Sequence, residues 1–177
     1  MADLENRTTL AAGRFVRLVS DEGWEFAERL NSTGVVVIVP VTDEGELVLT
    51  EQFRKPVGRR VVDLPAGLAG DGPGGADEAF VTAAQRELVE ETGYEAREMV
   101  LLAEGPSSAG LTSEIVTFYR AGGLTKVGPG GGDESEEIDV HLVPLESITT
   151  WLDNRVRQDC YIDPKVYVGL YFVLNSD

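Results

Sequence analysis

The sequence has one cysteine and few basic residues, and both shortages limit what the protein can be. A lone Cys160 cannot form an intramolecular disulfide, which fits a reducing cytosol, and we expect it to be a small buried side chain. The 15 Lys and Arg residues are outnumbered by 31 Asp and Glu residues, which gives a formal net charge of −16. Because such an acidic chain repels phosphate backbones, we predict no nucleic-acid partner.

Long hydrophobic runs are also missing. No uninterrupted apolar stretch approaches the roughly 20 residues that cross a membrane, and no basic and apolar leader opens the chain. We therefore expect a cytoplasmic protein with no membrane partner. Its 177 residues suit a single domain, 1–177, with a sizeable core.

Glycine, in contrast, is plentiful, and two stretches are rich in it, 67–75 and 128–132. Neither stretch has the spacing of a Walker or dinucleotide-binding loop. We interpret both as mobile loops that separate more regular elements.

Short β-like runs make up much of the chain. They occupy residues 14–18, 24–30, 34–40, 46–53, 60–64, 99–103, 115–121 and 138–143. The first two flank a turn at 21–23 and predict an N-terminal β-hairpin within residues 1–30. The continuous apolar run 34–40 predicts a buried central strand.

Helical patterns are fewer. One acidic helix interrupts the strands, a second is expected near 145–154, and a third begins at Asp163-Pro164, an N-cap residue followed by proline at the first helical position. Strands on both sides of one internal helix, with helices at the end, predict an α/β fold in which helices flank a mixed sheet.

The acidic helix carries the strongest functional pattern. Glu90 and Glu91 follow Glu87 by three and four residues, so a helix places the three carboxylates on one patch. Arg86 lies one turn before Glu90 on the same helix. Like charges so arranged repel, and a hard divalent cation with oxygen ligands would offset the repulsion. A solvated acidic face that binds nothing is the alternative interpretation.

The rest of this helix fits either interpretation. Val81, Ala84 and Leu88 form an apolar stripe that can pack on a core, and Gly93 supplies the left-handed residue that ends a helix.

With Gly72 and Glu78, the run 86–94 has the spacing G-x5-E-x7-R-E-L-x-E-E-x-G followed by an apolar residue. This spacing resembles the signature of Nudix hydrolases, whose fold is an α/β/α sandwich. The segments 51–54, 62–67, 106–114 and 133–141 are similar to the ADP-ribose pyrophosphatase group within that superfamily. The resemblance covers most of residues 33–155.

One departure from the family pattern concerns the first glycine. In the group this glycine belongs to the Leu-Pro-Ala-Gly run, which here ends at Gly67, too far from Glu78 for the usual spacing. We expect a five-residue insertion after Gly67, with Gly72 restoring the literal pattern by coincidence. The Ala66 carbonyl binds metal only if Gly67 occupies the family position.

The resemblance implies roles for individual residues. Metal ligands are Ala66, Glu87, Glu90 and Glu91, and catalytic residues are Glu134, Glu136, Arg86 and Glu90. Glu134 is the implied general base, Glu136 positions metal or water, and Arg86 orients Glu90. Arg54 and Glu114 are the implied substrate contacts. An exposed solubilising turn remains the alternative for the acidic loop, and an exposed strand end for Arg54.

The implied activity is metal-dependent hydrolysis of the pyrophosphate bond of nucleoside diphosphate sugars, with Mg²⁺ as cofactor and Mn²⁺ as a substitute. ADP-ribose, cleaved to AMP and ribose 5-phosphate, is the expected substrate. Alternatives are a GDP-mannose or broad sugar-nucleotide pyrophosphatase and, in another class, a noncatalytic nucleotide-sensing module. Members of the group are commonly homodimers, and the N-terminal hairpin is the expected interface.

Overall fold

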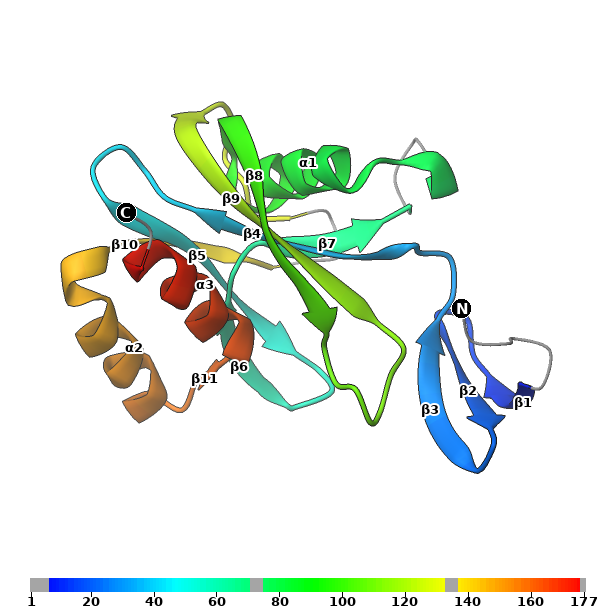
Figure 1. Ribbon diagram of the computed structural model, residues 1–177. Coiled ribbons are helices and arrows are strands. Elements are labelled where there is room, and N and C mark those ends of the chain that lie inside the picture. The colour runs from blue at the N-terminus through cyan, green and yellow to red at the C-terminus, as the bar shows by residue number, and fades with distance from the viewer. Residues whose placement is uncertain (1–6, 71–74, 133–136, 176–177) are drawn as a thin grey trace.

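The structure is a computed structural model that describes residues 7–70, 75–132 and 137–175 (Figure 1). Its strands are β1 (Thr8–Ala12), β2 (Val16–Asp21), β3 (Trp24–Arg29), β4 (Gly34–Pro40), β5 (Glu46–Arg54), β6 (Arg59–Asp63), β7 (Ala66–Ala69), β8 (Tyr94–Pro106), β9 (Ile115–Lys126), β10 (Asp139–Pro144) and β11 (Tyr161–Ile162). Its helices are α1 (Phe80–Thr92), α2 (Ile148–Arg157) and α3 (Pro164–Leu174), with 3₁₀ turns at Gly75–Asp77 and Leu145–Ser147.

The strands form two mixed four-stranded sheets and one N-terminal sheet. One mixed sheet has the order β10-β5-β6-β11, in which only β11 runs parallel to its neighbour. The other has the order β7-β4-β9-β8, in which β4 and β9 are parallel. The predicted α/β class with mixed pairing is confirmed, although two sheets share the strands that we expected in one.

Strand β4 lies between the two halves of the core, as its apolar run predicts. Val36 and Ile38 pack toward α1 with Ala84 and Leu88, while Val37 and Val39 belong to the second cluster, which includes residues of α2 and α3. Because successive side chains of a strand point to opposite faces, an unbroken run of valine and isoleucine fills both sides. Figure 1 shows the result, with α1 on one side of the sheets and α2 and α3 on the other.

Helix α1 ends where the sequence predicts. Gly93 has φ of 70° and donates its N–H to the carbonyl of Val89, the expected left-handed cap. The expected apolar stripe is partly wrong, because Val81 is exposed and Ala83 is buried in its place beside Ala84. At the start of the helix Phe80, rather than Val81, packs against the core, and Val81 is left exposed.

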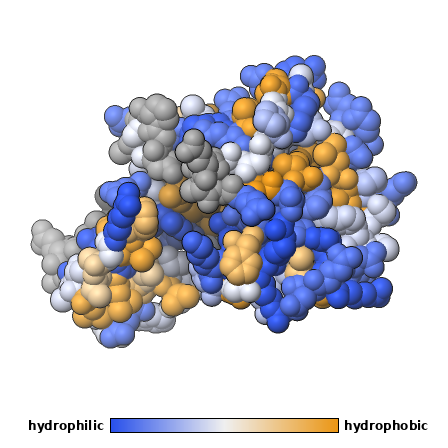
Figure 2. Space-filling model, turned by 180° about the vertical axis from the view of Figure 1, so that it is seen from behind, coloured by the Kyte–Doolittle hydropathy of each residue, from blue (hydrophilic) through white to orange (hydrophobic). Residues whose placement is uncertain are grey.

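The N-terminal hairpin is confirmed as β2 and β3, and β1 extends it to three antiparallel strands. This sheet stands at one end of the molecule (Figure 1) and touches the rest through the loop before β9, where Ala27 donates its N–H to the carbonyl of Leu111 at 2.8 Å. Viewed from behind, Figure 2 shows apolar residues gathered over this sheet, at the lower left. Apolar residues of this sheet and its turns that are at least 40% exposed include Leu10, Phe15, Val16 and Leu18.

In the described part of the chain, every helix is too short or too polar to cross a membrane.

Candidate functional site

Arg86 holds the glutamates of α1 together. Its guanidinium donates to the carboxylates of Glu87 at 2.7 Å and Glu90 at 3.1 Å, and to the carbonyl of Leu68 at 3.0 Å. The predicted contact between Arg86 and Glu90, one turn apart, is therefore present. Arg86 thus joins Glu87 and Glu90, two of the four predicted metal ligands.

Glu78, just before α1, completes this ionic group. Its carboxylate accepts from Arg86 at 3.1 Å and from the backbone N–H of Gly70 at 3.1 Å, and its side chain is only 4% exposed. Burial alone would lower the pKa of Arg86, but its hydrogen bond to the Glu78 carboxylate and the charge of Glu87 outweigh burial and raise this pKa above its ordinary value. Arg86 is therefore a permanent cation, and Glu78 is tied to it rather than free to act on a ligand.

Ala66 and Gly67 lie directly against the helix. The N–H of Ala66 donates to the Glu91 carboxylate at 3.1 Å, and a Cβ on residue 67 would overlap the Glu87 carboxylate. Only glycine allows this approach. Gly67 therefore occupies the place where strand and helix meet, as expected if the following glycine-rich stretch is an insertion; Gly72 lies outside the described residues.

The donor atoms at this place suit a hard divalent cation. Carboxylate oxygens of Glu87, Glu90 and Glu91 and the backbone at Ala66 offer only oxygen ligands, the kind that Mg²⁺ takes. Across the residues that the structure describes, however, no three acidic, histidine or cysteine side chains converge as a bound metal requires. Arg86 and the Ala66 N–H hold the carboxylates instead, so a bound cation would have to draw them together.

The glycine-rich stretch 128–132 is fixed against the end of α1. Gly131 and Gly132 donate their N–H groups to the carbonyls of Glu91 and Glu90 at 2.8 and 3.0 Å, and a Cβ on Gly130 would overlap the backbone of Thr92. This stretch is a loop, as expected, and its glycine N–H groups bond to carbonyls at the end of α1 that have no acceptor role left within the helix. The acidic loop that follows in sequence, with Glu134 and Glu136, lies outside the described residues.

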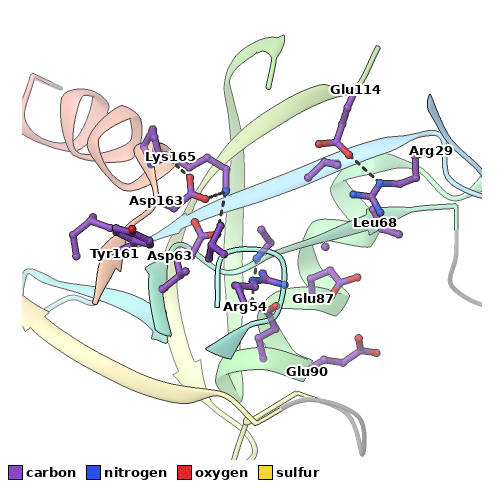
Figure 3. A pocket seen from close by; sticks show the side chains of 18 of the residues that line it. Arg29, Arg54, Asp63, Leu68, Glu87, Glu90, Glu114, Tyr161, Asp163 and Lys165 are labelled. Carbon is purple, nitrogen blue, oxygen red and sulfur yellow. Dashed lines mark hydrogen bonds and ion pairs between the residues drawn. The ribbon is translucent and has the colours of Figure 1, made fainter. Parts of the chain in front are cut away.

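A cleft of about 790 Å³ opens beside these groups. Its lining includes predicted residues from α1 and both predicted substrate contacts, Arg54 and Glu114. Figure 3 shows Arg54, Glu87 and Glu90 in the middle, with Glu114 and Arg29 together on one side. Arg29 donates to Glu114 at 2.9 Å, so Glu114 reaches the cleft as half of an ion pair.

Residues 32–162, three quarters of the chain, match the family model of the NUDIX domain. The chain belongs to the Nudix family. Its mixed α/β fold and its glutamate-bearing helix agree with that membership, and the chain is a Nudix hydrolase. Nudix hydrolases generally use divalent metal ions.

Several relatives of this Nudix hydrolase have named activities. It is 36% identical over 133 residues to an ADP-ribose pyrophosphatase of Bacillus subtilis, covering 75% of this chain and 69% of the relative. It is 36% identical over 116 residues to an ADP-ribose pyrophosphatase of Mycobacterium tuberculosis, covering 63% and 53%. It is also 33% identical over 169 residues to a methanol dehydrogenase activator of Bacillus methanolicus, covering 92% and 86%.

The fold itself has a solved counterpart. A crystal structure of an ADP compounds hydrolase superposes with a TM-score of 0.64 at 23% identity, covering 82% of this chain and 80% of that one. The similarity shows that the Nudix fold extends over most of the molecule.

The cleft of the Nudix hydrolase also contains residues for which the sequence predicted no role. Lys165, at the start of α3, lies 2.7 Å from Asp163 and 3.0 Å from Asp63. Burial raises the pKa of Asp63 to about 6, while the charge of Lys165 opposes the rise. No local spacing could reveal this group, because Asp63 ends β6 and Lys165 follows it by 102 positions in the sequence. Only the N-cap at Asp163 was predictable from the sequence. It is confirmed, because the backbone N–H of Lys165 donates to the Asp163 carboxylate.

A second ionic group lies among residues that do not line the cleft. The carboxylate of Glu51, 1% exposed, pairs with Arg60 at 2.5 Å, with His141 at 3.0 Å and with Arg155. Cys160 is buried beside it, as expected. Burial would raise the pKa of Glu51, but Arg60 and Arg155 outweigh it and lower the pKa to about 2. The cluster ties α2 to β5, because Arg155 belongs to α2 and Glu51 to β5.

Proposed function

We propose that this Nudix hydrolase cleaves the pyrophosphate bond of nucleoside diphosphate sugars, with ADP-ribose, split into AMP and ribose 5-phosphate, as its substrate. The observation that carries the proposal is the 36% identity to the B. subtilis ADP-ribose pyrophosphatase over 75% of the chain. The cleft supports it, because its volume of about 790 Å³ falls in the usual range of small-molecule sites and its lining joins Arg54 to the α1 carboxylates.

We propose Mg²⁺ as the metal, with Mn²⁺ able to substitute. Glu87, Glu90, Glu91 and the Ala66 carbonyl would hold it. When bound, such a cation neutralises the diphosphate, polarises a phosphoryl oxygen and lowers the pKa of a coordinated water.

The remaining roles belong to the chain itself. Arg86 keeps Glu87 and Glu90 oriented, as its hydrogen bonds already do. Arg54 offers a planar set of donors that can bind two phosphate oxygens at once. Glu114 contacts the substrate while paired to Arg29. In the acidic loop outside the described residues, Glu134 accepts the proton of the attacking water and Glu136 positions that water.

A panel of nucleotide sugars tests this function. Purified protein would be incubated with Mg²⁺ and each of ADP-ribose, ADP-glucose, UDP-glucose and GDP-mannose, and products would be identified by mass spectrometry. We expect the highest kcat/KM for ADP-ribose, with AMP and ribose 5-phosphate as products. Absence of turnover with every compound would refute the proposal.

GDP-mannose or broader sugar-nucleotide hydrolysis is the alternative within the same chemistry. A GDP-mannose pyrophosphatase of Enterobacter is 29% identical over 135 residues, covering 71% of this chain and 67% of the relative. The same panel decides between them, since a broad enzyme would hydrolyse several compounds at similar rates.

A second candidate function follows from the extent of one similarity. The match to the methanol dehydrogenase activator covers 92% of the chain, against 75% for the B. subtilis pyrophosphatase. The chain could therefore stimulate a dehydrogenase. To test this function, the protein would be added to purified methanol dehydrogenase of B. methanolicus. We expect the rate of methanol oxidation to rise, and an unchanged rate would exclude this dehydrogenase as the target of the protein.

We also propose that residues 1–177 form one domain and that the protein is a homodimer with its N-terminal sheet in the interface. The support is the exposed apolar surface of that sheet, which includes Phe15 at 61% and Trp24 at 66%.

A further inference from the structure

The segment that leads into α3 forms one side of the cleft. Strand β11 pairs in parallel with β6, and Asp163 then turns the chain into α3 by donating its N–H to the carbonyl of Val62 at 2.9 Å. Figure 3 shows Tyr161, Asp163 and Lys165 together on the side opposite Glu114 and Arg29, with Arg54, Glu87 and Glu90 lower in the view. The family match ends at residue 162, so it does not include Asp163 or Lys165.

The charges on this side disfavour an anion. The ammonium of Lys165 is already shared between the carboxylates of Asp63 and Asp163, so the three groups sum to −1 when both acids are ionised. A phosphate there would meet a net negative surface. The ligand group that fits is neutral and donates hydrogen bonds.

The hydrogen-bonding capacity is concentrated on Asp163. One oxygen accepts from the Lys165 N–H at 2.9 Å and the other lies 2.7 Å from the Lys165 ammonium, while the side chain remains 27% exposed in the cleft. A carboxylate has about four acceptor positions, so acceptor capacity is left for a ligand. Two adjacent hydroxyl groups match this arrangement, because each can donate to one carboxylate oxygen.

The neighbouring surface suits the carbon face of a sugar ring. Tyr161 is 48% exposed, with the guanidinium of Arg59 4.9 Å from the centre of its ring, and Val57, Val61 and Ile162 line the cleft beside it. We propose that Tyr161, Asp163 and Lys165 form a sugar subsite in which Asp163 accepts hydrogen bonds from the vicinal hydroxyls of a substrate ribose. This proposal rests on the function proposed above, since it assigns one end of the same substrate.

The substitution Asp163→Asn tests the subsite without removing the helix cap, because asparagine caps helices as well as aspartate does. With ADP-ribose, we expect KM to rise roughly tenfold, the usual worth of a hydrogen bond to a charged group, and kcat to change less than about twofold. Two analogues complete the experiment, one lacking the hydroxyls of the nucleoside ribose and one lacking those of the terminal ribose. Asp153→Asn, an exposed residue of α2, is the control.

The pattern across substrates decides the outcome. A KM penalty that disappears with one analogue supports the subsite and identifies the ribose that occupies it. An equal penalty with all three compounds, or none with ADP-ribose, overturns it. If the wild-type protein hydrolyses none of the three compounds, the proposed function fails, and the subsite is tested by binding instead. Calorimetry in EDTA then compares the affinity of wild type and Asp163→Asn for the same compounds. Equal affinities of the two proteins would refute the subsite.

Discussion

Arg86 shows how one residue organises the site. It bonds to three glutamates and a backbone carbonyl, from the segment before α1 and from β7 as well as from α1 itself. Such a position needs the planar, multidentate guanidinium, because an ammonium group could not span these acceptors. The same residue therefore affects stability and the positions of the proposed metal ligands.

Arg86→Met should destabilise the fold, because it leaves the buried carboxylate of Glu78 without its cation. We expect the free energy of unfolding, measured by urea titration, to fall by about 3 kcal/mol. Arg120→Met, on an exposed position of β9, is the control and should change it by less than about 0.5 kcal/mol. Equal stability of the two variants would contradict the structural role of Arg86.

Glu51 should make stability depend on pH in acid. Its folded pKa of about 2 lies below the ordinary 4.5, so the ionised carboxylate contributes stability that is present above pH 4.5 and is lost as the pH falls toward 2. Glu51→Gln should cost about 3 kcal/mol at pH 7 and flatten this dependence. Chemical unfolding between pH 2 and 7 measures the free energy of unfolding and its dependence on pH, with the exposed Glu146→Gln as control. If the stability of Glu51→Gln fell in acid as steeply as that of wild type, other groups would cause the pH dependence.

At the scale of elements, the site is a junction between α1, β7 and the glycine-rich stretch 128–132. Gly67 lets β7 touch the Glu87 carboxylate, and Gly131 and Gly132 bond to the last carbonyls of the helix. The described chain before the acidic loop ends at Gly132, whose N–H bonds to the carbonyl of Glu90. A general base in the acidic loop stays a prediction.

Gly67→Ala should damage activity more than stability. The added methyl group would overlap the end of the Glu87 side chain, which can rotate away, so the fold survives while one proposed metal ligand moves. We expect kcat/KM to fall by on the order of a hundredfold, with an unfolding temperature within a few degrees of wild type. Gly105→Ala in β8, where the new methyl group meets nothing within 4 Å, is the matched control. Full activity of Gly67→Ala would contradict the proposal that Glu87 is a metal ligand.

The elements that the sequence predicts are those with strong local patterns. The apolar run of β4, the spacing on α1 and the Asp163-Pro164 cap all appear where expected. Strands β1, β7 and β11 were missed, since β1 is exposed throughout and β7 and β11 have only four and two residues, too few for a periodic pattern. The same limit applies to the site. The glutamates of α1 lie in one local run of the sequence and were predictable. The pair of Asp63 with Lys165 and the pair of Arg29 with Glu114 form only through tertiary structure.

At the scale of the whole molecule, the N-terminal sheet stands apart from the two mixed sheets and exposes apolar side chains (Figures 1 and 2). Its connection to the rest includes the Arg29–Glu114 pair, which lines the cleft. A second copy bound to this sheet would therefore act close to the substrate.

The double substitution Phe15→Glu and Trp24→Glu should weaken the proposed dimer, because it places four added carboxylates in a two-fold interface. Light scattering should give twice the chain mass for wild type and the chain mass for the variant. Val127→Glu with Val156→Glu, both exposed and outside the N-terminal sheet, is the control. A wild-type protein that is monomeric and fully active at nanomolar concentration would contradict the dimer.

The proposed activity is hydrolysis of ADP-ribose with the carboxylates of Glu87, Glu90 and Glu91 on α1. The most direct test is the initial rate of AMP formation in saturating Mg²⁺. Wild type should release AMP and ribose 5-phosphate, and exposed Glu98→Gln in β8 should match it. Glu90→Gln should lower kcat by more than about a hundredfold while its unfolding temperature stays near that of wild type, because it removes a metal ligand that is half exposed. A Glu90→Gln variant with near-normal turnover would contradict the assignment of the site.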